Sequence, residues 1–250
     1  MPDTDRAHHD TIFGEHVAAL ATTDPELVET LDRLASDEAL RTSRLDARTC
    51  LMVRLAALVA CQGLGEYRAL LGAGLGDEVT PVEVKEIVYQ AVPYVGTARA
   101  LDALRVTNEV LVEHGVELPL PGQSTTTAED RTERGLAVQQ EIVGPDVVAS
   151  MYANAPADQA HVQRLLSANC FGDHYTRTGI DVPTRELLTF AMLVALGGAD
   201  PQVRGHVAAN RNVGNGRAVL VDVATQLLPY IGYPRTLNAL RAVDDVAPVP

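Results

Sequence analysis

Apolar residues in this chain recur three or four positions apart, which is the spacing of an amphipathic α-helix. Residues 25–34 carry leucine and valine on one face, directly after an Asp-Pro-Glu sequence that is typical of a helix start. A longer apolar stretch at residues 183–196 stops at Gly197 and Gly198, which favour the end of a helix. No segment alternates between apolar and polar residues as a half-buried strand does. The pattern therefore predicts a mostly helical protein.

Capping residues indicate where two further helices begin. Around Pro81 the sequence has the capping-box pattern, in which the Thr80 hydroxyl accepts from a backbone N–H group and the Glu83 carboxylate reaches back. Asp200 precedes a proline in a similar way, so we expect a helix from about residue 201 that carries His206.

A sequence repeat divides the chain into two halves. Residues 90–104 and 226–240 are identical at eight of fifteen positions, including a shared Pro-Tyr-x-Gly sequence. Upstream, the apolar runs that follow Asp46 and Val182 lie at nearly the same offset. The chain is therefore predicted to be a tandem duplication. Pro93 and Pro229 are expected to interrupt their helices, and each is followed by Tyr-x-Gly, which should produce a kink or a break before the last helix of each repeat.

Composition places the boundary between the repeats. Residues 115–135 are rich in proline, glycine, serine and threonine, which disfavours a continuous helix. We therefore expect a first repeat at residues 1–114, a connector at 115–135 and a second repeat at 136–250. Neither repeat is expected to bury all its apolar surface alone, so the two should dock as a pseudo-dimer of all-α bundles.

The charge balance excludes some classes of partner. The chain has 33 acidic and 20 basic side chains, a net charge of −13, which disfavours binding to nucleic acid or to an anionic membrane surface. No apolar run is long enough to span a bilayer, and the first ten residues have no signal-peptide character. Three cysteines are too few for a disulfide framework, so a reducing cytoplasm is expected.

Several common catalytic motifs are missing from the sequence. It contains no phosphate-binding loop, no His-Glu-x-x-His, no Gly-x-Ser-x-Gly and no Cys-x-x-Cys. A group of polar residues near the N-terminus could ligate a metal: His8, His9, Asp10 and His16. A polar terminus is more often without such a role, so neither a metal nor an organic cofactor is expected.

Four motifs in the second repeat carry a family resemblance. They are Phe171-Gly-Asp-His174-Tyr175-Thr-Arg177, Arg185-Glu186-Leu-Leu, Gln202-Val-Arg-Gly-His206-Val-Ala-Ala and Gln226-x-x-Pro-Tyr230-x-Gly232-x-Pro234. In order and spacing they resemble the carboxymuconolactone decarboxylase family, which shares the alkylhydroperoxidase D-like all-helical fold. The first repeat resembles it as well. The resemblance implies a homo-oligomer, a trimer of such tandem chains, but the superfamily includes both lactone decarboxylases and thiol peroxidases.

The thiol peroxidase function is disfavoured by the residues present. That branch uses Cys-x-x-Cys-x-x-x-His, and when its histidine is placed on His206 the cysteine positions hold Ala199 and Gln202. The corresponding positions of the first repeat hold no cysteine and no histidine. Without a thiolate there is no nucleophile to attack a peroxide.

The decarboxylase branch of the family implies a cofactor-independent decarboxylation or proton transfer on a small carboxylated lactone or unsaturated acid. Such a reaction needs a proton source and donors for a developing oxyanion. His206 is the best candidate for proton transfer, and the resemblance implies Glu186 as its carboxylate partner. Measured from the glycine turn, Glu186 is about 18 Å along one helix and His206 about 9 Å along the next, so an antiparallel hairpin would keep them apart. The contact requires crossing helices or a bridging water.

Further polar residues near His206 are candidates for substrate binding: His174, Tyr175, Arg204, Asn210 and Arg211. An arginine would suit a carboxylated substrate because its fork of donors matches a carboxylate. The alternative is that these side chains lie at the surface. His206 could be a core histidine, and Glu186 could serve only the helix dipole or pair with Arg185.

Two functions therefore stay open. The first is an enzyme whose second repeat is active and whose first repeat, without the histidine, is structural. The second is a non-catalytic helical assembly or small-ligand-binding protein derived from the family. Tyr94 and Tyr230, beside the prolines, are expected to be packing and interface residues rather than acids.

Overall fold

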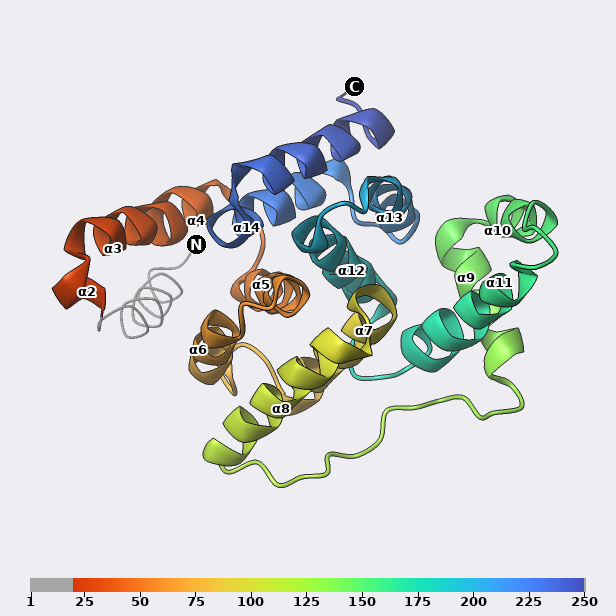
Figure 1. Cartoon of the computed structure of the whole chain (residues 1–250), viewed down its shortest axis with the longest axis horizontal. Helices are drawn as coiled ribbons and strands as arrows, with labels where there is room; N and C mark the ends of the chain where they lie inside the picture. The colour runs from red at the N-terminus through yellow and green to blue at the C-terminus, as the bar shows by residue number, and fades with distance from the viewer. Residues whose placement is uncertain (1–19, 250) are drawn as a thin grey trace.

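The computed structural model describes residues 20–249, apart from the side chains of residues 36–38, 40 and 41. In this part of the chain the regular structure is helical, with one isolated bridge between Leu75 and Val79 (Figure 1). The all-α prediction is confirmed. The N-terminal group His8, His9, Asp10 and His16 lies outside the described residues.

The helices fall into two successive sets. The first set is α2 (Leu20–Thr23), α3 (Pro25–Asp32), the π-helical η1 (Arg33–Glu38), α4 (Ala39–Thr42), α5 (Ala47–Cys61), α6 (Leu64–Gly74), α7 (Pro81–Val95) and α8 (Thr97–Glu113). The second set is α9 (Arg131–Val143), α10 (Pro145–Ala153), α11 (Ala160–Leu165), the π-helical η2 (Leu166–Tyr175), α12 (Val182–Leu196), α13 (Asp200–Asn212) and α14 (Arg217–Val246).

The same order of helices occurs in both sets. In the second set α12 and α13 correspond to α5 and α6, and the two parts of α14 correspond to α7 and α8. The chain breaks at Gly96 in the first set and at Gly232 within α14, where φ is 82° and 75°. Pro93 and Pro229 lie inside their helices, because a proline loses one backbone hydrogen bond but keeps a helical φ. The expected break before the last helix of each repeat is therefore present, but it falls at the glycine of Tyr-x-Gly, whose positive φ cannot continue a helix, and the prolines do not interrupt their helices.

Helices α5 and α12 pack along each other at the centre of the molecule (Figure 1). Each also packs against a helix of the other repeat: α5 packs against α14, and α12 packs against α7. Nearly all their side chains are buried, since both helices are apolar around their whole circumference. One continuous hydrophobic core thus crosses both repeats, as the pseudo-dimer prediction requires.

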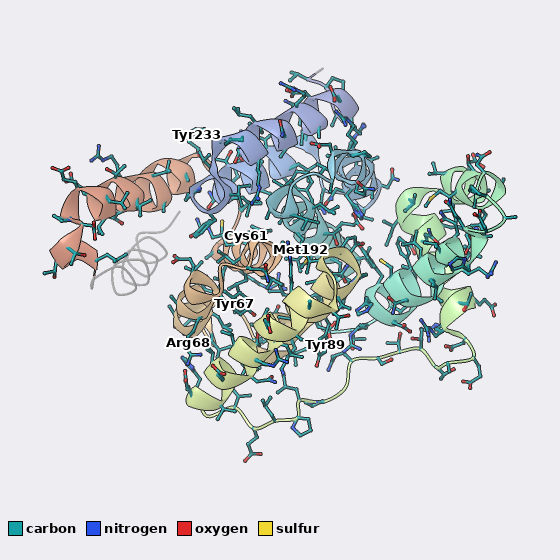
Figure 2. All side chains as sticks on the ribbon, viewed as in Figure 1. Cys61, Tyr67, Arg68, Tyr89, Met192 and Tyr233 are labelled. Atoms are coloured by element: carbon teal, nitrogen blue, oxygen red, sulfur yellow. The ribbon has the colours of Figure 1, made fainter. Side chains whose placement is uncertain are left out.

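Side chains in this core and at its edge have contrasting exposure. Met192 on α12 and Tyr67 on α6 are fully buried, whereas Tyr233, directly after the glycine break in α14, is 62% exposed (Figure 2). Leu27 on α3 is also exposed, although its spacing predicted an inward face. No helix in the described part of the chain is long and apolar enough to cross a membrane.

The segment between the two sets is extended and runs along one side of the molecule (Figure 1). Helix α9 begins at Arg131, within the expected connector. The Thr125 and Thr126 hydroxyls donate to backbone carbonyls of Thr176 and Gly172, which attaches this segment to η2 and the turn after it.

Helix α9 and η2 pack very closely through two glycines. A Cβ atom at Gly172 would lie 2.1 Å from the Arg131 carbonyl oxygen, and one at Gly135 would lie 2.1 Å from the Ser167 carbonyl oxygen. Both positions therefore require glycine. This contact fixes η2, which ends at Tyr175.

The helix starts agree in part with the capping patterns. Thr80 and Glu83 form both hydrogen bonds of the capping box at the start of α7, as predicted. Asp200, in contrast, lies in the first turn of α13 and makes no capping hydrogen bond, because the helix begins one residue earlier than expected and Ala199 is its N-cap residue.

Candidate active site

Glu186 and His206 are in direct contact. The Nδ1 atom of His206 on α13 lies 2.8 Å from Oε2 of Glu186 on α12. The Asn210 side chain donates to the backbone carbonyls of Glu186 and His206, at 3.0 and 2.8 Å, and so holds α13 against α12. Because an antiparallel hairpin would separate Glu186 from His206, the two helices must cross, and no bridging water is needed for the contact.

Glu186 is fully buried, and its second carboxylate oxygen also accepts a hydrogen bond. The Tyr175 hydroxyl donates to Oε1 of Glu186 at 2.5 Å. The same hydroxyl lies 3.1 Å from the Thr189 hydroxyl and 3.0 Å from the Tyr94 hydroxyl, so it can accept from both. Both carboxylate oxygens are thus held by donors, as a buried charge requires.

Tyr94 brings the first repeat into this site. It lies on α7, and its ring stands edge-on to the His206 ring, with the centroids 5.5 Å apart and the planes at 79°. Its hydroxyl accepts from the Cys170 thiol at 3.5 Å. The sequence predicts a packing and interface role for Tyr94, and it does not predict the hydrogen bonds of the hydroxyl. The Pro-Tyr-x-Gly sequence shared by the repeats is the signal that could have drawn attention to it.

Burial keeps the hydroxyl and thiol groups around Glu186 protonated. It raises the pKa of Tyr94 and of Tyr175 well above the usual value for a tyrosine, and nearby ionisable groups, Glu186 among them, raise both further. It also raises the pKa of the Cys170 thiol to about 12. Tyr175 therefore acts as a hydrogen-bond donor to Glu186, and Cys170 offers no thiolate at neutral pH.

The His206 ring has one nitrogen facing inward and one available. A carboxylate is an acceptor only, so Nδ1 carries a proton that it donates to Glu186. The Nε2 atom makes no hydrogen bond with any residue in the described part of the chain, and the side chain is 17% exposed. The arrangement suits proton exchange at Nε2, with Glu186 fixing the tautomer and stabilising the charged ring.

Four of the remaining predicted site residues divide into two groups. Tyr175 and Asn210 belong to the network around Glu186 and His206. Arg204 pairs instead with Asp245 at 3.1 Å, and Arg211 donates to the Val246 carbonyl at 2.9 Å, so both engage the end of α14.

His174 is half-buried on η2, and its Nδ1 atom has no hydrogen-bond partner. Burial lowers the pKa of His174 to about 4, and it is the largest cause of the shift. The ring is therefore neutral at physiological pH.

A second buried polar cluster adjoins the first and joins the repeats. Arg185 pairs with Glu86 on α7 at 2.8 Å, and not with its neighbour Glu186. Arg177 also pairs with Glu86, at 2.8 Å. Gln90 links the two clusters, because it accepts from Arg185 and donates to Thr189. The sequence reasoning did not anticipate this cluster, whose members come from both repeats.

The first repeat has no counterpart of the His206–Glu186 pair. Counted from the helix starts, the equivalent positions hold Leu51 on α5 and Leu70 on α6, both buried in the core. Tyr230, the counterpart of Tyr94, has Arg54 over its ring at 5.8 Å. Among the described helices, the acid–histidine pair therefore comes from the second repeat, and the first repeat contributes Tyr94 to its surroundings.

Two cavities lie elsewhere in the molecule. One of about 330 Å³ lies between α7, α8 and the extended segment, and a smaller one adjoins Gly197 and Gly198. Neither is lined by His206. The His206 side chain is 17% exposed.

Comparison with known proteins gives two matches. The model of the carboxymuconolactone decarboxylase family matches residues 25–109 and again residues 160–245. The 4-carboxymuconolactone decarboxylase of Acinetobacter baylyi is 30% identical over 118 residues, which are 47% of this chain and 87% of that protein. Tyr94 lies in the first matched region, whereas Glu186 and His206 lie in the second.

Proposed function

Because this chain belongs to the carboxymuconolactone decarboxylase family, we propose that it is a cofactor-independent carboxy-lyase that acts on a small carboxylated lactone or unsaturated acid. The observation that carries the proposal is the hydrogen bond between His206 and the buried Glu186. It leaves the second ring nitrogen of His206 without a partner among the described residues. A similar protein is named a 4-carboxymuconolactone decarboxylase, which supports the reaction class.

The chemistry needs one proton for each turnover. When the carbon–carboxylate bond breaks, carbon dioxide leaves and the bonding electron pair moves into the conjugated carbonyl system. A carbon of the resulting dienolate, over which this electron pair is delocalised, must then be protonated. In our proposal the His206 imidazolium donates this proton from Nε2, and solvent returns a proton to the ring. Glu186 stabilises the imidazolium before the transfer and holds the ring in place.

The hydroxyl groups around Glu186 support this role. Tyr175 donates to Glu186 and is itself close to the Tyr94 and Thr189 hydroxyls, so protein donors hold the carboxylate. In a buried setting such fixed dipoles interact more strongly than they would in water. We therefore assign Tyr175, Tyr94 and Thr189 as positioning residues.

A thiol peroxidase reaction lacks its nucleophile here. Ala199 and Gln202 occupy the positions at which that branch has cysteines. Cys170 is near Tyr94, but its raised pKa keeps it a thiol. These observations support a decarboxylase over a peroxidase.

The assembly and location remain part of the proposal. We place the protein in the cytoplasm, as its few cysteines indicate. A trimer of tandem chains, as the family resemblance implies, would cover part of the molecular surface. The partly exposed edge of His206 is a surface that such an assembly would enclose.

A second candidate is a non-catalytic ligand-binding protein. It is favoured by the location of the 330 Å³ cavity, which lies away from His206. In that case the His206–Glu186 pair would serve packing alone.

The test is carbon dioxide release from 4-carboxymuconolactone and a panel of related carboxylated lactones and unsaturated acids. We expect turnover of at least one of them by the wild-type protein, and a loss of about 100-fold or more in His206→Ala. No turnover by the wild type would favour the second candidate. Equal rates in both proteins would remove His206 from the mechanism.

A further inference from the structure

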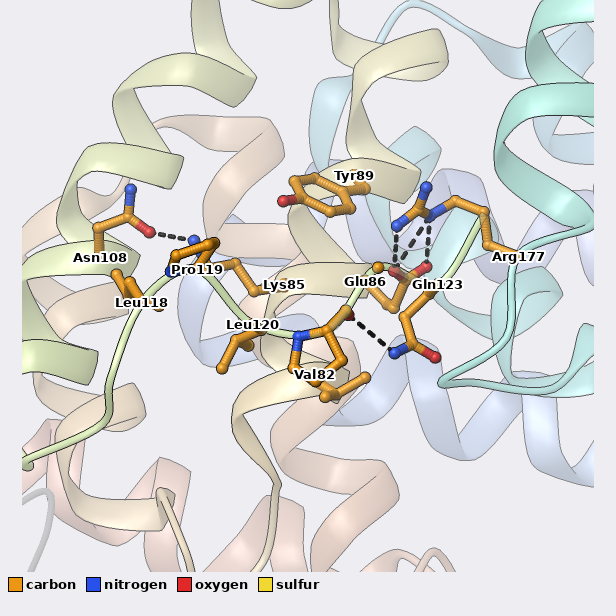
Figure 3. Close-up of a pocket in the computed structure, with 12 residues that line it drawn as sticks. Val82, Lys85, Glu86, Tyr89, Asn108, Leu118, Pro119, Leu120, Gln123 and Arg177 are labelled. Carbon is orange, nitrogen blue, oxygen red and sulfur yellow. Dashed lines mark hydrogen bonds and ion pairs between the residues drawn. The ribbon is translucent and has the colours of Figure 1, made fainter. Parts of the chain in front are cut away.

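The cavity between α7, α8 and the extended segment has one polar and one apolar wall (Figure 3). Lys85, Glu86 and Tyr89 of α7, with Asn108 of α8, form much of the polar wall. Residues 118–121 of the extended segment form the opposite wall with leucine and proline. At about 330 Å³ the cavity is at the lower end of the range for small-molecule sites.

The charges in the cavity do not cancel. Glu86 is its only acidic lining residue, and the Glu86 carboxylate is already shared by Arg177 and Arg185. Lys85 has no acidic partner in the described part of the chain, and its ammonium group donates to the neutral Oδ1 atom of Asn108. The lining therefore carries a net positive charge in a chain whose net charge is −13.

Lys85 is the only lysine in the sequence; the other basic residues are arginines. It is half-buried, and burial lowers its pKa. The ammonium group is thus partly removed from water without a negative charge to offset the loss. An anion bound beside the Lys85 ammonium group would supply the favourable electrostatic interaction that offsets this loss.

We propose that this cavity binds a small organic carboxylate. The carboxylate would lie beside the Lys85 ammonium group and the Asn108 amide, and the hydrocarbon part against Leu118, Pro119 and Leu120. A bare inorganic anion would leave this apolar wall unused. The site shares no lining residue with the His206–Glu186 pair, so the proposal goes beyond the proposed function and does not depend on it.

Calorimetric titration with benzoate, cinnamate and hexanoate tests the proposal, with benzyl alcohol as a neutral ligand of similar shape. We expect saturable binding of at least one carboxylate and about tenfold weaker binding by Lys85→Met. Arg105→Met is the matched control, because Arg105 is an exposed cation on α8 that pairs with Asp102 and does not line the cavity. This variant should bind as the wild type does, and so should His206→Ala.

A second measurement uses the single lysine directly. Reductive methylation with ¹³C-formaldehyde keeps the charge and labels Lys85 as the only lysine side chain, so its NMR signal should shift and saturate with the carboxylate that binds. The proposal is overturned if no carboxylate of the three binds the wild type at about 10 mM, or if benzyl alcohol binds as well as benzoate. It is also overturned if Lys85→Met binds equally, if His206→Ala or Arg105→Met loses binding, or if the Lys85 signal does not move.

Discussion

The side chains of His206 and Glu186 form a 2.8 Å hydrogen bond across two helices, although the residues are 20 positions apart in the sequence. The carboxylate is fully buried, and the histidine keeps one edge exposed. Tyr94 from the first repeat lies against the histidine ring and close to the Tyr175 hydroxyl. The duplicated fold therefore builds a single polar site in which both halves of the chain take part.

The two equivalent tyrosines give a matched pair of variants. Tyr94→Phe removes a hydroxyl from the network around Tyr175, and we expect about a tenfold loss of turnover because one hydrogen bond that helps to position Glu186 is lost. Tyr230→Phe makes the same chemical change at the equivalent position of the other repeat and should leave turnover within about twofold. Steady-state kinetics measure the turnover of both variants, and thermal melts check that both are folded. Equal losses in the two would show that the tyrosines act through packing.

Helix positions could be read from the sequence to a large extent. Helix α12 ends where the two glycines predicted, and the capping box at Thr80 is formed as expected. The break in α14 was displaced from Pro229 to Gly232, because the local signal of a proline overstates its effect near the end of a helix. Capping and glycine signals thus placed these helix ends, whereas the prolines placed the break before the last helix of each repeat three residues too early.

The pKa of His174 predicts a stability that depends on pH. The folded protein holds this pKa near 4, against about 6.5 for an unperturbed histidine, so the folded state favours the neutral ring. As the pH falls from about 6.5 to 4, the unfolded chain takes up a proton that the folded chain does not, and stability is lost through this window. The loss from this residue is at most about 3 kcal/mol.

The variant His174→Gln should lack the loss of stability at low pH that His174 causes. Urea unfolding of wild type and variant at several pH values between about 4 and 7.5 measures it, and the difference between the two curves isolates His174 from other titrating groups. A constant difference across the whole range would contradict the prediction.

The buried ion pairs between the repeats give a third prediction. Glu86→Gln would leave Arg185, which is fully buried, without a negative partner, so we expect a loss of about 3 kcal/mol in the free energy of unfolding. Glu109→Gln removes the same charge from an exposed pair with Arg68 and should cost less than about 1 kcal/mol. Similar losses in the two variants, measured by urea unfolding, would be inconsistent with a buried charge cluster.

The close contact between α9 and η2 gives a fourth prediction. Gly172→Ala would force a Cβ atom against the Arg131 carbonyl, so we expect a loss of stability of about 2 kcal/mol and lower turnover, because η2 carries Tyr175. Gly65→Ala on α6 meets no atom within 4 Å and should be neutral or stabilising by up to about 1 kcal/mol. Thermal melts and kinetics check both variants. An unchanged Gly172→Ala protein would mean that the two helices separate readily.

The candidate site was only partly visible in the sequence. His206 and Glu186 could be selected by residue type and by family resemblance, but their contact depends on the crossing of two helices, which helix length alone does not give. Arg204 and Arg211 had suitable chemistry for a carboxylate, yet they interact with the end of α14. The position of Tyr94 beside a proline indicates packing and interface contacts, whereas its site partners are at least 76 positions away in the chain. Such long-range proximity is a property of the docked repeats rather than of any local pattern.

The most direct test of the central claim is a double-mutant cycle on carbon dioxide release, with whichever lactone or acid the wild type turns over fastest. If His206 and Glu186 act as one unit, His206→Ala and Glu186→Gln should each reduce kcat by about 100-fold or more, and the double variant should be no slower than His206→Ala alone. Losses that multiply in the double variant, or single variants as fast as the wild type, would contradict the account.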